Sequence, residues 1–289
     1  MNTSALTRVR SWLFTPGTRP DRFDKAAISG ADVSIIDLED AVAPRDKPDA
    51  RGTALAHLAQ PAVGPCARAL RINALVTRFG IADLHALLES GASPDYLVLP
   101  KSESAAHLQI LDRLLSEASK ATRLVALIES AKGLAAVEEI AASTPRLTAL
   151  LFGAADMSAD LGAVTAWAPL AYARARLVAA CALAGVLAID TPFFDVKDHE
   201  GLTQETSQAV ALGFTGKAAI HPNQIATINA ALTPLPEQVA HARAILAEND
   251  KGVGVVEGQM VDEAIARKAH RILAAAGESI PTNSSSQSK

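Results

Sequence analysis

The chain has 289 residues, of which 49% are hydrophobic, and its formal net charge is −4 at pH 7. This length suits one large domain with a buried core, and the mild acidity argues against the basic face of nucleic-acid-binding proteins. The first residues lack the apolar centre of a signal peptide, and no apolar run is long enough to span a membrane. We therefore expect no nucleic-acid and no membrane partner.

Eight short β-like runs recur along the chain, and Ala- and Leu-rich stretches with helical spacing separate most of them. Gly30, Gly91, Gly185 and Gly213 each precede a run, at the point where a helix often ends on a left-handed residue. The alternation predicts a parallel sheet, and eight strands in this length favour a closed (β/α)8 TIM barrel over an open doubly wound sheet. The predicted strands are Trp12–Thr15, Val33–Leu38, Ala67–Ile72, Tyr96–Leu99, Leu124–Ile128, Ala149–Phe152, Val186–Ile189 and Ala218–Ile220.

The two cysteines, Cys66 and Cys181, stand in apolar surroundings and lack metal-ligand spacing. Such residues are typical of buried thiols in a cytoplasmic protein.

Polar residues gather just past the ends of these runs. In barrels of this kind the C-terminal strand ends carry the chemistry, so the clustering supports a barrel independently of the strand count. The polar residues are Asp37, Glu39, Asp40, Arg71, Asn73, Lys101, Glu129, Asp156, Asp190 and His221.

Glu129 and Asp156 follow two successive apolar runs, so parallel strands would bring both carboxylates to one edge of the sheet. Two hard oxygen ligands with open positions left over suit Mg²⁺ that carries a substrate. Glu129 has an alternative role as a helix N-terminal carboxylate, and Asp156 as a turn residue with Asp160 as the rival ligand. We favour Asp156, because it follows the glycine turn at the strand end directly.

Arg71 offers a planar fork suited to the carboxylate of a 2-oxoacid, although it could instead pair with Asp37 or Glu39. The acidic residues Asp37, Glu39 and Asp40 either orient Arg71 and metal-bound water or form a solvated rim, and we favour the first role. Lys101 and Lys217 raise a rival mechanism, since a lysine at a strand end can form a Schiff base with a carbonyl. The carboxylate pair favours Mg²⁺ over that rival.

More than fifty residues follow His221, which ends the predicted barrel. Two helical stretches, LPEQVAHARAILAEND and MVDEAIARKAHRILAAAG, flank the glycine-bearing KGVGVVEGQ. We expect a catalytic barrel over residues 1–230, a helical lid over 231–280 and a disordered tail over 281–289. A homo-oligomer would give the last helix a surface on which to bury its apolar face.

Several motifs occur in one order along most of the chain. They are SWLFTPGTRPDRFDKA, IIDLEDAVAPRDKPDAR, RIN, VLPKSES, ALIESAKGL, FGAADMSADLG, DVKDHEGL and GFTGKAAIHPNQI. Together they resemble the citrate lyase β-subunit-like family of Mg²⁺-dependent CoA-ester lyases, within the HpcH/HpaI aldolase superfamily. The resemblance implies a (β/α)8 barrel, Mg²⁺ as cofactor, a CoA thioester and a 2-oxoacid as ligands, and a trimeric or hexameric homo-oligomer.

The resemblance also implies roles for single residues. Glu129 and Asp156 match the family's Mg²⁺ ligands, and Arg71 matches the arginine that holds the substrate carboxylate. Asp262 resembles an aspartate that enters a neighbouring subunit's site, although it could be only a helix-start carboxylate. Further substrate-binding positions are Phe14, Arg19, Lys25, Ala155, Ile220 and His221.

This sequence departs from the family at some positions. Many members carry an acidic residue at Ala155 and an aromatic one at Met157, and a basic residue and a proline near Gln259 and Glu263. These departures leave the metal ligands intact but weaken the assignment of Asp262.

The implied reaction is the reversible carbon–carbon cleavage of a 3-hydroxyacyl-CoA, with (S)-citramalyl-CoA giving acetyl-CoA and pyruvate as the preferred case. Asp262 is the candidate for proton transfer at the acetyl methyl carbon. Alternatives are a malyl-CoA or citryl-CoA lyase or thioesterase, a CoA-independent metal aldolase, and a partner-dependent citrate lyase β subunit.

Overall fold

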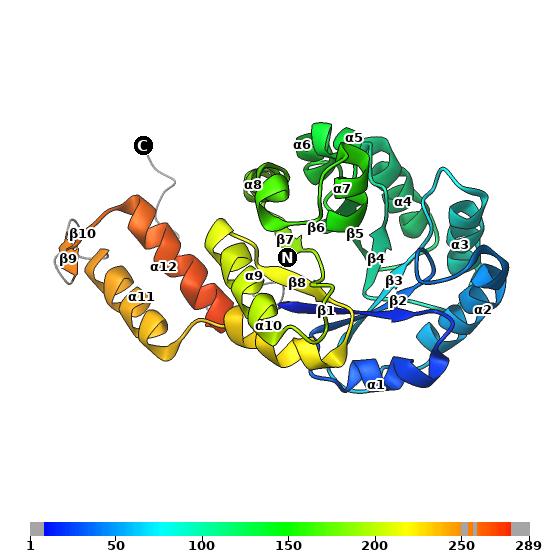
Figure 1. The fold of residues 1–289 in the computed structure, drawn as a ribbon, viewed down its shortest axis with the longest axis horizontal. Helices are drawn as coiled ribbons and strands as arrows, with labels where there is room; N and C mark the ends of the chain where they lie inside the picture. The colour runs from blue at the N-terminus through cyan, green and yellow to red at the C-terminus, as the bar shows by residue number, and fades with distance from the viewer. Residues whose placement is uncertain (1–8, 250–253, 257–258, 279–289) are drawn as a thin grey trace. The chain divides into compact units, whose positions relative to one another are not determined.

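The structure is a computed structural model that describes residues 9–249, 254–256 and 259–278 (Figure 1). The chain divides into two compact units, of which one is Arg10–Asn229 and the other contains the chain from Ala230 onward. In the described part of the chain, no helix has both the length and the apolar character needed to cross a membrane.

The first unit is a closed barrel of eight parallel strands in sequence order, as predicted. Each strand pairs with the next, and β1 closes the barrel against β8 with Leu13 opposite Ala219. The strands are β1 Ser11–Pro16, β2 Val33–Asp37, β3 Ala67–Arg71, β4 Tyr96–Leu99, β5 Arg123–Ile128, β6 Leu147–Phe152, β7 Leu187–Asp190 and β8 Gly216–Ala219.

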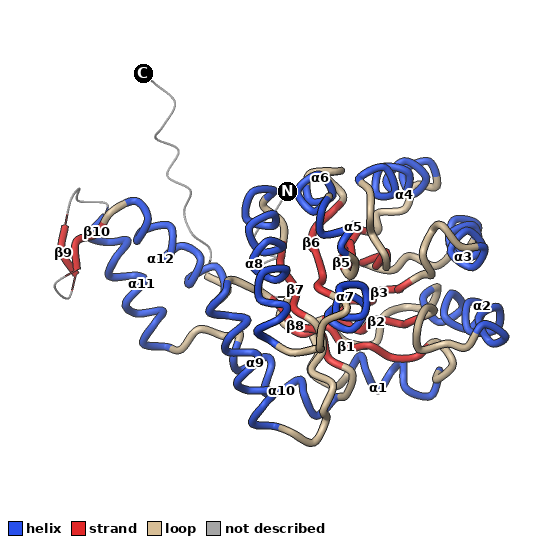
Figure 2. Tube along the Cα trace, turned by 45° about the horizontal axis from the view of Figure 1, so that its top comes forward, coloured by secondary structure: helices blue, strands red, loops and turns tan. Residues whose placement is uncertain are grey.

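Helices surround these strands on the outside of the barrel (Figure 2). Strand side chains that point outward pack against the apolar faces of the helices, and this contact forms the main core. The helices are α1 Phe23–Ala27, α2 Lys47–Leu58, α3 Arg78–Glu89, α4 Ala105–Glu117, α5 Ala131–Ala135, α6 Val137–Ala141, α7 Ala154–Leu161, α8 Trp167–Ala184, α9 His199–Leu212 and α10 Ile225–Ala231.

Three of the four glycines predicted to be left-handed have positive φ: Gly30 at 86°, Gly185 at 72° and Gly213 at 113°. The prediction was wrong for Gly91. Helix α3 ends at Glu89 and is capped by Ser90, whose hydroxyl donates to the Leu87 carbonyl oxygen at 2.9 Å and accepts from the Ala92 N–H at 3.2 Å. Because a serine side chain satisfies the helix end, no left-handed residue is required there.

Strand β8 begins at Gly216, two residues earlier than predicted, and therefore includes Lys217. This lysine is fully buried, and its ammonium group lies 2.7 Å from Asp190 Oδ2 and 2.8 Å from Glu205 Oε1. A paired charge inside the barrel is not visible in the pattern of apolar residues, so the sequence placed the strand too late.

The second unit pairs α11 Pro236–Asn249 with α12 Glu263–Ala276. Ala242, Ile245, Val261, Ala269 and Leu273 form its apolar cluster. A short antiparallel pair, β9 Gly254–Val256 and β10 Gln259–Val261, connects the helices and was not predicted. The predicted tail 281–289 and the stretches 250–253, 257–258 and 279–280 of the predicted lid lie outside the described residues, so the lid and its boundaries stay predictions.

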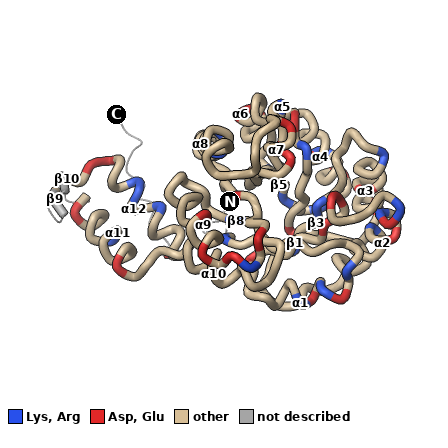
Figure 3. The backbone as a smooth tube through the Cα atoms, in the orientation of Figure 1, with Lys and Arg blue, Asp and Glu red and all other residues tan. Residues whose placement is uncertain are grey.

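Charged residues of both signs are interspersed over the barrel rather than separated by sign (Figure 3). A local cluster of charges at the C-terminal strand ends lies where a barrel of this kind carries its functional site.

Candidate functional site

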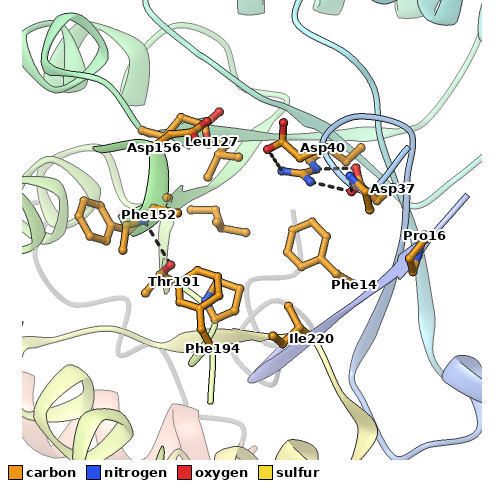
Figure 4. A pocket seen from close by; sticks show the side chains of 18 residues that line it. Phe14, Pro16, Asp37, Asp40, Leu127, Phe152, Asp156, Thr191, Phe194 and Ile220 are labelled. Atoms are coloured by element: carbon orange, nitrogen blue, oxygen red, sulfur yellow. Dashed lines mark hydrogen bonds and ion pairs between the residues drawn. The ribbon is translucent and has the colours of Figure 1, made fainter. Parts of the chain in front are cut away.

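A cavity of about 440 Å³ opens at the C-terminal ends of the barrel strands. Figure 4 shows Asp37, Asp40 and Asp156 along one side of it, and Phe14, Phe194 and Ile220 along the other. The polar lining comprises Asp37, Asp40, Arg71, Glu129, Asp156 and Thr191, and the apolar lining includes Phe14, Leu127, Leu151, Phe152, Phe194 and Ile220. The cavity thus has a charged wall and an apolar wall.

Glu129 directly follows β5 and is only 4% exposed. Its Oε1 accepts a hydrogen bond from the backbone N–H of Lys101 at 2.7 Å. Burial, and secondly the nearby Glu39 carboxylate, raise the pKa of Glu129 to about 8. Gly153, after β6, gives this side chain room, because a Cβ at position 153 would lie 2.6 Å from Glu129 Cβ and 2.8 Å from its Oε2.

Asp156 lies in the first turn of α7, and its side chain is 42% exposed. Its rival Asp160 lies on the same helix but does not line the cavity. The Asp160 carboxylate accepts the Ala131 N–H at 2.7 Å, at the start of α5. Asp156 is therefore the carboxylate that α7 contributes to the cavity, together with the neighbouring Ala155.

Arg71, at the end of β3, pairs with both Asp37 and Glu39, the partners that the sequence analysis gave as its alternative to a substrate carboxylate. Its Nε and Nη2 each donate to Asp37 at 2.7 Å, and its Nη1 lies 3.0 Å from Glu39 Oε2 and 3.8 Å from Asp40 Oδ2. Burial opposes the charge, but the three carboxylates raise the pKa of Arg71 overall. The Phe14 ring covers the guanidinium at 4.9 Å, so Arg71 is held on several sides within the cavity wall.

The acidic residues after β2 are held by a buried lysine that the sequence analysis missed. Lys47 Nζ donates to the backbone oxygens of Leu38 and Glu39 at 2.9 and 2.7 Å, and to Asn73 Oδ1 at 2.5 Å. Lys47 and Asn73 belong to the IIDLEDAVAPRDKPDAR and RIN motifs. Those motifs therefore supply both the charged residues and the support that fixes their loop.

Lys101 joins three of the carboxylates. Its Nζ lies 2.6 Å from Glu39 Oε1 and 3.2 Å from Asp156 Oδ2, while its backbone N–H binds Glu129. Lys217, the other Schiff-base candidate, does not line the cavity and is enclosed by Asp190 and Glu205. Both lysines are therefore engaged in ion pairs, which disfavours the Schiff-base mechanism.

The donor atoms suit a divalent cation. Asp37, Glu39, Glu129 and Asp156 place carboxyl oxygens around Arg71 and Lys101, and oxygen ligands of this kind are the ones that Mg²⁺ prefers. Among the described residues, no group of three or more His, Cys, Asp or Glu is arranged so that these side chains alone could hold a metal ion. Two carboxylates with open positions, as Glu129 and Asp156 would provide, leave room for the water and substrate oxygens that Mg²⁺ prefers.

A second cavity, of about 370 Å³, shares Phe14, Pro16 and Ile220 with the first. Its basic lining consists of Arg19, Arg22, Lys25 and His221. Arg19 Nε pairs with Asp21 at 2.9 Å, and His221 Nδ1 accepts the Asn223 N–H at 3.2 Å. The predicted substrate residues of the barrel are thus divided between two adjoining cavities.

Several lining residues were missed by the sequence analysis. Leu127 and Leu151 stand two positions before Glu129 and Gly153, so the two-residue repeat of a strand could have assigned them to the same face. Thr191 and Phe194 follow β7 in a loop that has no such repeat. Thr191 Oγ1 accepts the Ala154 N–H at 3.2 Å, which connects this loop to the start of α7.

Asp262 belongs to the second unit and forms the N-cap of α12, where its Oδ1 accepts the Ile265 N–H at 2.8 Å. Asp262 therefore has the helix-start role that the sequence analysis gave as its alternative. A role of Asp262 in a neighbouring subunit's site stays a prediction.

The family model described as HpcH/HpaI aldolase/citrate lyase matches residues 10–222. An L-malyl-CoA/beta-methylmalyl-CoA lyase from Rhodobacter capsulatus is 40% identical over an alignment that covers 91% of this chain and 93% of that protein. Among solved structures, RipC from Yersinia pestis is 57% identical, with a TM-score of 0.73 over 81% of this chain and 99% of that chain. CitE from Mycobacterium tuberculosis, in complex with magnesium, acetoacetate and coenzyme A, is 36% identical, with a TM-score of 0.80 over 94% and 100% of the two chains.

The matched range contains every barrel residue singled out by sequence, from Phe14 to His221, and it excludes Asp262. The resemblance inferred from the motifs is therefore confirmed at the level of the family and of the barrel fold. The chain belongs to the HpcH/HpaI aldolase/citrate lyase family.

Proposed function

We propose that this chain is a Mg²⁺-dependent lyase that reversibly cleaves a carbon–carbon bond of a 3-hydroxyacyl-CoA. The preferred substrate is (S)-citramalyl-CoA, which yields acetyl-CoA and pyruvate. The observation that carries the proposal is the two-sided cavity lined by Glu129, Asp156 and Arg71, whose apolar wall, on the side away from Asp156, includes Phe14, Phe194 and Ile220. Relatives named as lyases of CoA esters, and a structural neighbour in complex with magnesium and coenzyme A, support the same assignment.

Glu129 and Asp156 would hold the Mg²⁺. The bound ion supplies a Lewis acid for the substrate oxygen that becomes the ketone. Arg71 would orient the carboxylate of the 2-oxoacid through Nη1, which it would share with Glu39 Oε2 at 3.0 Å, because Asp37 occupies both Nε and Nη2. Ala155 lies in the first turn of α7, where backbone N–H groups lack intrahelical acceptors and favour an anion.

The lining supports pyruvate over its competitors. The methyl group of pyruvate would rest on the apolar wall, whereas glyoxylate from malyl-CoA would leave that wall unused. Oxaloacetate from citryl-CoA carries a second carboxylate that needs its own cation. Arg71 would already serve the first carboxylate, Lys101 is paired with Glu39 and Asp156, and a second carboxylate on the apolar wall would be buried without a partner.

The second cavity fits the remainder of a CoA thioester. Arg19, Arg22 and Lys25 give it a basic lining suited to phosphate groups, and it adjoins the first cavity at the shared residues Phe14, Pro16 and Ile220. The thioester carbonyl would lie where the two cavities meet.

In the cleavage direction the hydroxyl proton leaves, the carbon–carbon bond breaks, and its electron pair forms the enolate of acetyl-CoA. That enolate must then take a proton on its methyl carbon. We assign this proton transfer to Asp262 of a neighbouring subunit in a homo-oligomer, a trimer or hexamer. The assignment rests on the family resemblance of Asp262 and not on its placement here.

A panel of citramalyl-CoA, malyl-CoA and citryl-CoA, each with and without Mg²⁺, tests the proposal. We expect acetyl-CoA and pyruvate to appear from citramalyl-CoA, and only when Mg²⁺ is present. Free CoA released without a 2-oxoacid would instead indicate a thioesterase. Activity only on hydroxy-oxoacids that lack CoA would indicate a metal aldolase and would contradict the proposal.

A further inference from the structure

Lys101 occupies an unusual backbone conformation beside the candidate metal ligands. Its φ is 48°, a left-handed value that side-chain-bearing residues adopt rarely and that is often associated with functional sites. The turn after β4 is fixed by Ser102, whose N–H donates to the Leu127 carbonyl oxygen at 3.1 Å and whose hydroxyl donates to the Leu99 carbonyl oxygen at 2.9 Å. This conformation directs the Lys101 N–H to Glu129.

The Lys101 ammonium group has two partners in different surroundings. Glu39 Oε1 lies 2.6 Å away on a side chain that is 7% exposed, and Asp156 Oδ2 lies 3.2 Å away on a side chain that is 42% exposed. The contact with Asp156 is the longer one and lies nearer to solvent, so it is weaker than the contact with Glu39. The Asp156 contact can therefore break while Lys101 stays on Glu39.

The Asp156 contact competes with any cation that Asp156 would ligate. A divalent cation near Asp156 would repel the Lys101 ammonium group, and the two would share one carboxylate. Without a cation, the ammonium group offsets the mutual repulsion of Glu39, Glu129 and Asp156. The same lysine thus stabilises the metal-free arrangement and opposes metal binding.

We propose that Lys101 is an internal counter-ion that holds Asp156 in the metal-free protein and releases it to the divalent cation while remaining paired with Glu39. This inference rests on the proposed function, because it takes Glu129 and Asp156 as the ligands. Lys101 is a positioning residue in this account. It weakens Mg²⁺ binding, and its backbone amide keeps Glu129 in place whether or not the ion is bound.

The test is Mg²⁺ titration of metal-free protein by calorimetry, with two variants that lack the ammonium group. In Lys101→Gly the left-handed backbone is favoured, so the N–H bond to Glu129 is kept. Lys101→Met keeps the length of the side chain. Because one positive charge is removed next to the site, we expect the Kd for Mg²⁺ to fall at least about threefold in both variants.

Two further variants test whether the change in Kd comes from the positive charge at position 101. Lys132 is an exposed lysine paired with Glu103 at 3.1 Å and does not line the cavity, so Lys132→Met should leave the Kd unchanged. Lys101→Arg keeps a positive charge beside Glu39 and should bind Mg²⁺ as the wild type does. A Kd that falls less than about threefold or rises in both charge-free variants, or that falls equally in Lys101→Arg, overturns the inference.

The same titration separates this inference from the proposed function. If Asp156→Asn binds Mg²⁺ as tightly as the wild type does, the ligand assignment fails and the Lys101 inference fails with it. If Asp156→Asn abolishes binding while the Lys101 variants match the wild type, only the Lys101 inference is wrong.

Discussion

Arg71 and Asp37 form a two-pronged ion pair at the strand ends, with Nε and Nη2 each 2.7 Å from a different oxygen of the carboxylate. Both residues are buried, at 9% and 1% exposure. A guanidinium fixed in this way presents its remaining edge in one orientation. The pair therefore connects the stability of the barrel to the orientation of the substrate.

We expect Arg71→Lys to weaken folding as well as substrate binding. An ammonium group keeps the charge but cannot span both Asp37 oxygens, and loss of a charge-assisted bond of this kind costs about 1.5–3 kcal/mol. Urea unfolding should show that loss, and the KM for pyruvate in the condensation direction should rise while the KM for acetyl-CoA changes little. Equal increases in both KM values would contradict the role of Arg71.

Arg51→Lys is the matched control for Arg71→Lys. Arg51 pairs with buried Asp83 at 2.6 Å and does not line either cavity. This variant should lower the free energy of unfolding without a change in the KM for pyruvate.

Gly153→Ala should displace Glu129, because the new methyl group would lie within 2.8 Å of two of its atoms. We expect Mg²⁺ binding by calorimetry to weaken severely while circular dichroism shows a folded barrel. Gly91→Ala adds the same methyl group where nothing lies within 4 Å, and it should bind Mg²⁺ as the wild type does. Unchanged binding in Gly153→Ala would show that Glu129 is not a ligand.

The pKa of Glu129, about 8, predicts how Mg²⁺ binding depends on pH. The carboxyl group must lose its proton to act as a ligand, so affinity should rise by about tenfold per pH unit up to about pH 8 and then level off. Calorimetry between pH 6 and 9 measures this slope. A flat profile over that range would mean that Glu129 is already ionised or does not bind the metal.

The same raised pKa makes the metal-free protein less stable as the pH rises, whereas it makes Mg²⁺ binding stronger. The folded state holds the Glu129 proton more tightly than the unfolded state, where the pKa is near the ordinary 4.5. Its contribution to stability is complete below that value and is lost as the pH rises through about 8. Glu129→Gln should remove this part of the pH dependence of urea unfolding, which serves as the control for the binding profile.

The trans role of Asp262 is tested by mixing two inactive variants, Glu129→Ala and Asp262→Ala, under conditions that exchange subunits. If one subunit supplies the metal site and another the aspartate, mixed oligomers regain part of the lost activity. Proven mixed oligomers without recovery would limit Asp262 to its observed role as the N-cap of α12.

The barrel could be predicted from sequence because buried parallel strands have a strong and repeated signature. Each of the eight apolar runs became a strand, and even the least accurate, at β8, overlaps the observed Gly216–Ala219. Local chemistry was harder to predict: Ser90 ends α3 through its own hydroxyl, so Gly91 needed no special conformation. The β9–β10 pair was missed because its strands are only three residues long.

The site was predicted as a set of residues but not as a network. The carboxylates followed from their places at strand ends, whereas the contact of Lys101 with Glu39 joins residues 62 positions apart and depends on the turn after β4. Lys47 and Thr191 were missed for a related reason, because each acts on the backbone of another segment. Such contacts have no periodic signal in a single sequence.

The central claim is that Glu129 and Asp156 hold the Mg²⁺ on which cleavage of a CoA ester depends. The most direct test is acetyl-CoA release from (S)-citramalyl-CoA by protein stripped of metal with EDTA, before and after Mg²⁺ is added back. We predict that wild-type activity is lost on stripping and restored by Mg²⁺, whereas Asp156→Asn stays inactive at the same Mg²⁺ concentration. Full activity of the stripped protein, or of Asp156→Asn with Mg²⁺, would contradict the account.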